Sequence, residues 1–172
     1  KTVIYDPLLV MTLPVKIAGP SGMNAIAHCV EALYAQDANP ITSLMAEEGI
    51  RTLASSLPVV VSQPDNLDAR TEALYGAWLA GSCLGSVGMS IHHKLCHTVG
   101  GTYNLPHAET HTIILPHAVW YNHDAVPQAM TRIGHALART DLSGASPAAA
   151  LYDLAQKIGA PLALRDIGMK AQ

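Results

Sequence analysis

The residues best suited to chemistry in this sequence are histidines, and five of its nine histidines fall within Ser90–His111. His93 and His97 are four residues apart, so on a helix their side chains share one face. His107 follows the pair Gly100-Gly101, which is typical of a helix end and lets the chain fold back. The spacing therefore predicts that His93, His97 and His107 point into one pocket.

A second pair of polar residues has the same helical spacing. Asn24 and His28 are four residues apart in an apolar segment that is rich in helix-forming residues. We expect His28 to join the three later imidazoles, and spacing alone leaves a metal site and a metal-free acid/base site as equal alternatives. Taken singly, the other histidines are expected to be satisfied or surface residues: His92, His111, His117, His123 and His135.

Helices must position these side chains, because the sequence predicts a mainly α fold, a helical bundle of about seven helices. A short strand-like run at residues 3–5 precedes an extended segment at residues 8–22, which is interrupted by Pro14 and by Gly19-Pro20. The predicted helices cover residues 23–35, 41–57, 68–86, 89–99, 107–122, 125–139 and 147–158.

Composition narrows the class of protein. With 172 residues, 49% of them hydrophobic, the chain can bury a substantial core as one domain. The net charge of −3 and the absence of a block of like charge exclude a typical nucleic-acid partner. No run of 18 apolar residues and no signal-peptide pattern occurs, so we expect no membrane partner. Three cysteines without a CxxC pair favour reduced thiols and a cytoplasmic location.

Two segments carry a resemblance to a known family. The order GPSGMNAIAHCVEALYA, followed by HHKLCHTVGGTYNLPHAETHTIILPHAVWYN, resembles the iron-containing alcohol dehydrogenase family, and within it the maleylacetate reductase branch. The resemblance covers nearly the whole chain and implies the C-terminal helical domain of that family. Residues 1–20 would then connect to a dinucleotide-binding domain outside this sequence, and residues 21–172 would form a helical catalytic domain truncated at its C-terminus. No GxGxxG motif occurs here.

The resemblance also implies a ligand set. The family typically holds its metal with one aspartate and three histidines, and the matching positions are Asn24, His28, His93 and His107. His97 matches the residue beside the nicotinamide and the substrate. Asn24 offers a neutral amide in place of a carboxylate, although three histidines can still hold zinc. We therefore expect NADH or NADPH as the cofactor and no metal, and His28, His93 and His107 as ligands if a metal is present.

The implied reaction is the reduction of maleylacetate to 3-oxoadipate in the degradation of aromatic compounds. Hydride added to the alkene carbon β to the ketone makes an enolate, which requires a proton donor and a partner for the oxyanion. We expect His97 to be the proton donor and His93 or His107 to stabilise the enolate.

The substrate is a small dicarboxylate, for which three residues are candidate partners. We expect Asn24, His28 and Lys94 to bind it, because the NH₂ of asparagine donates hydrogen bonds where an ionised aspartate cannot. Without a metal, partly protonated imidazoles would also attract this anion.

Two other functions remain open at this point. One is a metal-dependent alcohol dehydrogenase of the same family, using iron or zinc, in which Asn24 coordinates weakly. The other is a non-catalytic helical module whose histidines store metal or contact a partner, although a simple bundle does not need such interleaved Gly, Pro and His. Subunits of the family commonly pair, so the resemblance also implies a homodimer.

Overall fold

The computed structural model describes residues 2–138, 140 and 146–170, which form seven α-helices and two short 3-10 helices with no strand among them. The predicted bundle of about seven helices is therefore confirmed. The α-helices are α1 Val15–Ala32, α2 Pro40–Ser62, α3 Leu67–Ser86, α4 Ile91–Tyr103, α5 His107–Asn122, α6 Pro127–Ala138 and α7 Pro147–Lys157. The 3-10 helices are η1 Pro7–Val10 and η2 Leu164–Ile167. Arg139, the predicted last residue of the sixth helix, lies outside the described residues.

The N-terminal part differs from the sequence prediction. Residues 3–5 lie in no strand, and the extended segment predicted for residues 8–22 is wrong, because α1 begins at Val15 directly after Pro14. Pro20 lies inside α1, where a proline removes one helical hydrogen bond. The helix nevertheless continues, because this stretch is buried against neighbouring helices, and tertiary packing overrides weak local propensity. Residues 15–20 thus belong to the bundle rather than to a connecting segment.

Helix α4 is also longer than predicted. It passes through Gly100-Gly101 and ends at Tyr103, and its C-cap is Asn104, whose φ of 51° is left-handed and whose N–H donates to the carbonyl of Gly100. The N–H of Leu105 donates to the same carbonyl at 3.0 Å. This turn satisfies the end of the helix and directs the chain into α5, which begins at His107 as predicted.

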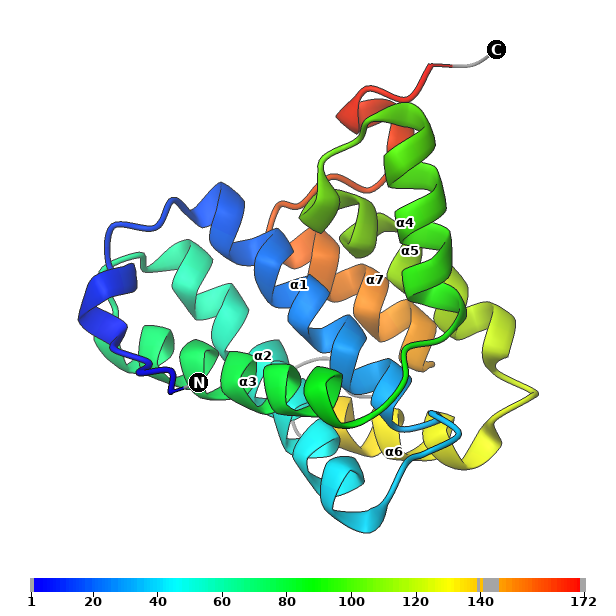
Figure 1. The fold of residues 1–172 in the computed structure, drawn as a ribbon. Helices are drawn as coiled ribbons and strands as arrows, with labels where there is room; N and C mark the ends of the chain where they lie inside the picture. Colours follow the sequence, from blue (N-terminus) through cyan, green and yellow to red (C-terminus); the bar gives the residue numbers. More distant parts are fainter. Residues whose placement is uncertain (1, 139, 141–145, 171–172) are drawn as a thin grey trace.

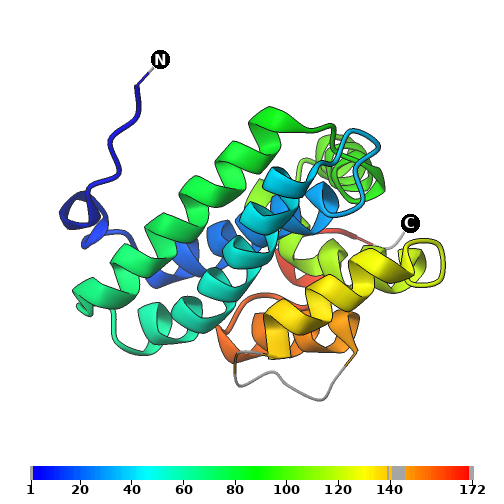
Figure 2. The ribbon, with the colours of Figure 1, turned by 90° about the horizontal axis from the view of Figure 1, so that it is seen from below.

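Helix α1 is the centre of the bundle (Figure 1) and packs against α2, α3, α5 and α7. Helices α4 and α5 pair on one side of α1, and the N-terminal segment with η1 lies on the side away from them (Figures 1 and 2). Helix α6 packs against α2 and α7. Close approach of α1 to α2 depends on Gly22, since a Cβ there would lie 2.3 Å from Cδ2 of Leu57. The packing fixes one face of α1 against the α4–α5 pair.

None of the described helices is by itself long and apolar enough to cross a membrane. Within the described part of the chain, one pair of helices, α3 and α4, meets that test of length and composition when taken together, and the pair is bent by 97° at the break.

Candidate active site

Helices α1, α4 and α5 bring together the four histidines that the sequence analysis singled out. The ring centroids of His28 and His93 are 4.8 Å apart and stacked, and those of His93 and His97 are 6.1 Å apart. His97 lies 5.9 Å from His107 across the α4–α5 pair. The prediction that these imidazoles share one site is thus confirmed in its geometry, while their chemical roles stay a prediction.

His111 and His92 also belong to this histidine cluster, although the sequence analysis treated them as satisfied or surface residues. The ring of His111 lies 4.3 Å from His107, 4.9 Å from His93 and 6.0 Å from His97. Nδ1 of His111 and Nε2 of His92 share a hydrogen bond of 3.0 Å. The signal for His111 was present in the sequence, because it follows His107 by four residues, as His97 follows His93.

A buried carboxylate on α1 accepts hydrogen bonds from the beginning of α4, beside the cluster. Glu31 is 0% exposed and accepts hydrogen bonds of 2.7 Å from the backbone N–H groups of Ser90 and His92 and from Nδ1 of His93. Glu31 was not predicted from the sequence. Its signal was its place on α1, three residues after His28 and therefore on nearly the same face.

The charge of Glu31 decides how His93 is oriented. Burial opposes ionisation, but the hydrogen bonds from His93, Ser90 and His92 outweigh it and lower the pKa of Glu31. The carboxylate is therefore ionised at neutral pH and accepts the proton on Nδ1 of His93. This leaves Nε2 of His93 turned toward the other imidazoles, in the same way that an outer carboxylate orients a metal-binding histidine.

Burial keeps three of the histidines neutral. It lowers the pKa of His28 to about 4, with further contributions from His93 and His107, and Glu31 opposes the shift. Burial, followed by the neighbouring imidazoles, lowers the pKa of His111 to about 3 and that of His92 to about 2. His28 is therefore neutral at neutral pH, because its charged form is desolvated.

Three buried polar atoms in this region have no hydrogen-bond partner among the described residues: Oδ1 of Asn24, Nε2 of His93 and Nε2 of His111. Such atoms are costly unless a ligand or solvent satisfies them. They mark the cluster as a place built to receive a polar group.

The histidines of the cluster differ in their exposure to solvent. His92 and His111 are 0% exposed, whereas His97 and His107 are exposed. The exposed edge of the cluster is therefore formed by His97 and His107, and the unpartnered nitrogen of His93 lies buried behind it. Lys94 is exposed, and among the described residues no contact places it with the cluster, since it follows His93 by about 100° around α4.

The family of this chain follows from comparison with known proteins. Residues 19–172 match the family model for the Fe-containing alcohol dehydrogenase family, C-terminal, so the chain belongs to this family. A maleylacetate reductase of Pseudomonas sp. (strain P51) is 56% identical over 99% of this chain and 47% of its own length. The chain thus spans about half the length of the curated relatives it matches.

Solved structures give the same relation. The crystal structure of maleylacetate reductase from Rhizobium sp. strain MTP-10005 matches with a TM-score of 0.92 and 48% identity, over 98% of this chain and 47% of that one. Maleylacetate reductase from Agrobacterium tumefaciens matches with a TM-score of 0.92 and 50% identity over the same shares of the two chains. The helical fold described above is therefore the fold of these C-terminal halves.

The histidines that the resemblance assigns to iron differ from the histidine triples whose ring nitrogens lie closest together. Among the described residues, two histidine triples have ring nitrogens within 4.8 Å of one another: His92 with His93 and His111, and His97 with His107 and His111. Neither triple is the implied set of His28, His93 and His107. In addition, a neutral amide stands at position 24, so the site lacks the anionic ligand that would favour a hard divalent ion.

Proposed function

We propose that this chain forms the substrate-side half of a nicotinamide-dependent reductase that converts maleylacetate to 3-oxoadipate without a metal ion. The observation that carries the proposal is the histidine cluster, which has unpartnered polar atoms on His93 and His111 and an exposed edge at His97 and His107; the unpartnered amide oxygen of Asn24 lies one helical turn before His28. Relatives named maleylacetate reductase, 56% identical and aligned over nearly the whole chain, support this substrate.

Bound NADH or NADPH would supply the hydride. The open edge of the cluster at His97 suits the approach of a planar ring, because His97 is exposed and lies on the same face of α4 as buried His93. When the alkene carbon β to the ketone gains the hydride, its π electrons move to the ketone oxygen as an enolate. His97 then gives a proton to the α-carbon, which completes the reduction of the double bond.

The enolate oxygen needs a donor in a place from which water is excluded. His93 would meet this need as an imidazolium, in which Nδ1 donates to Glu31 and Nε2, turned into the cluster, donates to the oxygen. A carboxylate 2.7 Å from Nδ1 can also hold the ring in place while a proton is exchanged at Nε2. His107 is exposed at the edge of the cluster and is the second candidate for stabilising the enolate oxygen.

The substrate carboxylates need donors rather than a metal. Asn24 donates through its amide NH₂, and neutral His28 on the same face of α1 donates one N–H. Lys94 is exposed on α4 and stays a prediction for the second carboxylate.

Three expectations concern the intact protein: the position of its dinucleotide-binding part, its oligomeric state and its location. The dinucleotide-binding part of the protein would lie over the exposed edge formed by His97 and His107 and bring the nicotinamide to it. A homodimer and a cytoplasmic location remain predictions.

A matched pair of histidine variants tests the proposal in the intact protein. His97→Ala should lower kcat with maleylacetate and NADH by about 100-fold or more, since it removes the acid. His117→Ala is the control, because His117 is exposed on the same pair of helices but outside the cluster. Oxidation of NADH at 340 nm reports the rate, and wild-type turnover by His97→Ala would contradict the mechanism.

A metal-dependent alcohol dehydrogenase is the second candidate, and the two histidine triples favour it. Three neutral imidazoles can hold zinc with an open position for substrate. Loss of turnover on chelation, restored by added iron or zinc, would support this function instead.

A further inference from the structure

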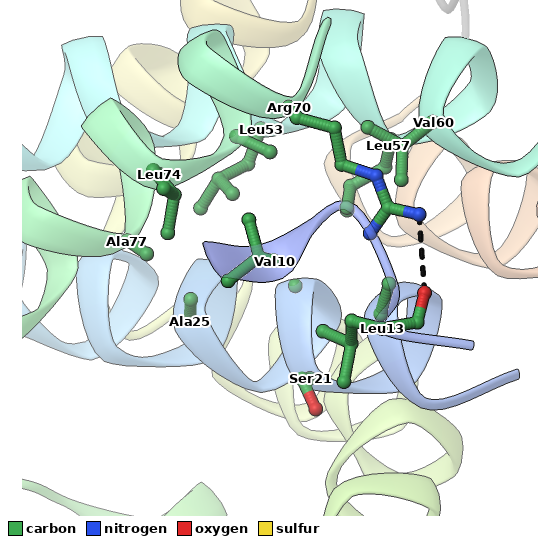
Figure 3. A pocket seen from close by; sticks show the side chains of 13 residues that line it. Val10, Leu13, Ser21, Ala25, Leu53, Leu57, Val60, Arg70, Leu74 and Ala77 are labelled. Carbon is green, nitrogen blue, oxygen red and sulfur yellow. Dashed lines mark hydrogen bonds between the residues drawn. The ribbon is translucent and has the colours of Figure 1, made fainter. Parts of the chain in front are cut away.

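A second cavity lies away from the histidine cluster, between η1, α1, α2 and α3. Its volume is about 170 Å³, and its wall is almost entirely apolar, with Val10, Leu53, Leu57 and Leu74 among the lining side chains (Figure 3). The cavity borders the side of α1 that carries Ser21 and Ala25, whereas Asn24 and His28 belong to the histidine site. Nothing in the proposed reaction uses this space.

Arg70 is the charged side chain among those that line this mostly apolar cavity. Figure 3 shows the guanidinium of Arg70 beside Leu13, Leu57 and Val60. Arg70 is only 3% exposed, and it donates from Nε to the carbonyl of Pro64 and from Nη2 to the carbonyl of Leu13, both at 3.1 Å.

These two acceptors are neutral, so the charge of Arg70 is not compensated. Within the described ranges, no carboxylate lies at ion-pair distance from it, and Nη1 has no acceptor. A buried cation without an anion is unfavourable, because burial removes its hydration and no counter-charge replaces it. The N–H groups of Arg70 that these two bonds do not use can therefore donate to an anion in the cavity.

We propose that this cavity binds a small apolar monocarboxylate, with the carboxylate on Arg70 and the hydrocarbon part against Leu53, Leu57 and Leu74. Arginine binds carboxylates strongly through its planar fork of N–H groups, and binding sites for small molecules are mostly apolar with a few such polar groups. An apolar cavity of about 150 Å³ in another protein accommodates benzene, so the present volume suits a single six-membered ring. Benzoate has this size and charge. The site does not depend on the proposed reductase activity.

Benzoate binding to the intact protein, measured by isothermal titration calorimetry, tests the site. We expect one benzoate per chain, and benzyl alcohol, which keeps the ring but has a neutral CH₂OH in place of the carboxylate, should bind about tenfold or more weakly. Equal affinity for the two compounds would show that Arg70 does not recognise the ligand. Absence of benzoate binding, as when another part of the intact protein fills the cavity, would also overturn the proposal.

Two alanine-to-leucine variants locate the binding. Ala77 lines the cavity, so Ala77→Leu should fill it and weaken benzoate binding about tenfold or more. Ala149 is exposed in the first turn of α7 and does not line the cavity, so Ala149→Leu should bind benzoate as the wild type does. Unchanged binding by Ala77→Leu would place benzoate elsewhere and contradict the proposal. Arg70→Gln tests the role of the positive charge, and this variant should no longer bind benzoate more tightly than benzyl alcohol.

Discussion

Replacing Glu31 with glutamine removes the charge that orients the histidine cluster while keeping the shape of the side chain. Three N–H groups, those of Ser90, His92 and Nδ1 of His93, point at the carboxylate from 2.7 Å. A glutamine has one acceptor oxygen, so its NH₂ must face at least one of these donors.

The expected loss of stability follows from the number of N–H groups that glutamine leaves without an acceptor. A buried donor left unpaired costs about 1–3 kcal/mol, and the remaining bonds lose the extra strength that a charged acceptor gives them. We expect Glu31→Gln to lower the free energy of unfolding by about 3 kcal/mol. In the intact enzyme, kcat should fall about 10- to 100-fold, as when the carboxylate behind a functional histidine is replaced.

Urea denaturation of the 172-residue chain at pH 7, followed by circular dichroism, measures the change in stability. Glu72→Gln is the matched control, because Glu72 is exposed on α3, and its effect should stay within about 0.5 kcal/mol. Equal stability of Glu31→Gln and Glu72→Gln would refute the argument that Glu31 is ionised and supports the cluster.

Two further predictions concern stability. His92 and His111 are neutral when folded, with pKa values of about 2 and 3, but take up protons in the unfolded chain below the ordinary value of 6.5. The unfolded state thus binds more protons, and the free energy of unfolding should fall by about 1.4 kcal/mol per pH unit for each histidine below pH 6.5. Urea titrations from pH 7 to pH 5 measure this slope, and a flat profile would contradict neutral burial. Gly22→Ala should destabilise the chain by about 1–3 kcal/mol, because its Cβ would meet Leu57 at 2.3 Å. In contrast, Gly81→Ala, exposed on α3, should stabilise the helix by about 0.5–1 kcal/mol, and thermal melts of the two variants shifted in the same direction would contradict this packing.

The histidine pairs were the part of the site that could be predicted, because helical spacing is a local property. His93 and His97 share a face wherever their helix lies, and the turn before His107 needs only to reverse the chain. Helix α5 was predicted over the same residues that it occupies, since the loop that ends at Pro106 precedes its first residue, His107.

The role of Glu31 could not be predicted in this way. Its partners, Ser90, His92 and His93, lie about sixty residues later in the chain, and only the packing of α1 beside α4 brings them together. His111 was missed for a related reason, since each histidine considered singly is more often a surface residue. The beginning of α1 was misplaced because Gly19-Pro20 is locally a helix breaker, and its burial between helices is a tertiary effect.

The metal requirement of the intact protein tests the central claim most directly. We predict that protein stripped by a strong chelator, with iron and zinc far below one ion per chain by mass spectrometry, reduces maleylacetate at the rate of untreated protein. A rate that falls on stripping and returns when iron or zinc is added would contradict a cluster in which imidazoles, the amide of Asn24 and the carboxylate behind His93 work without an ion.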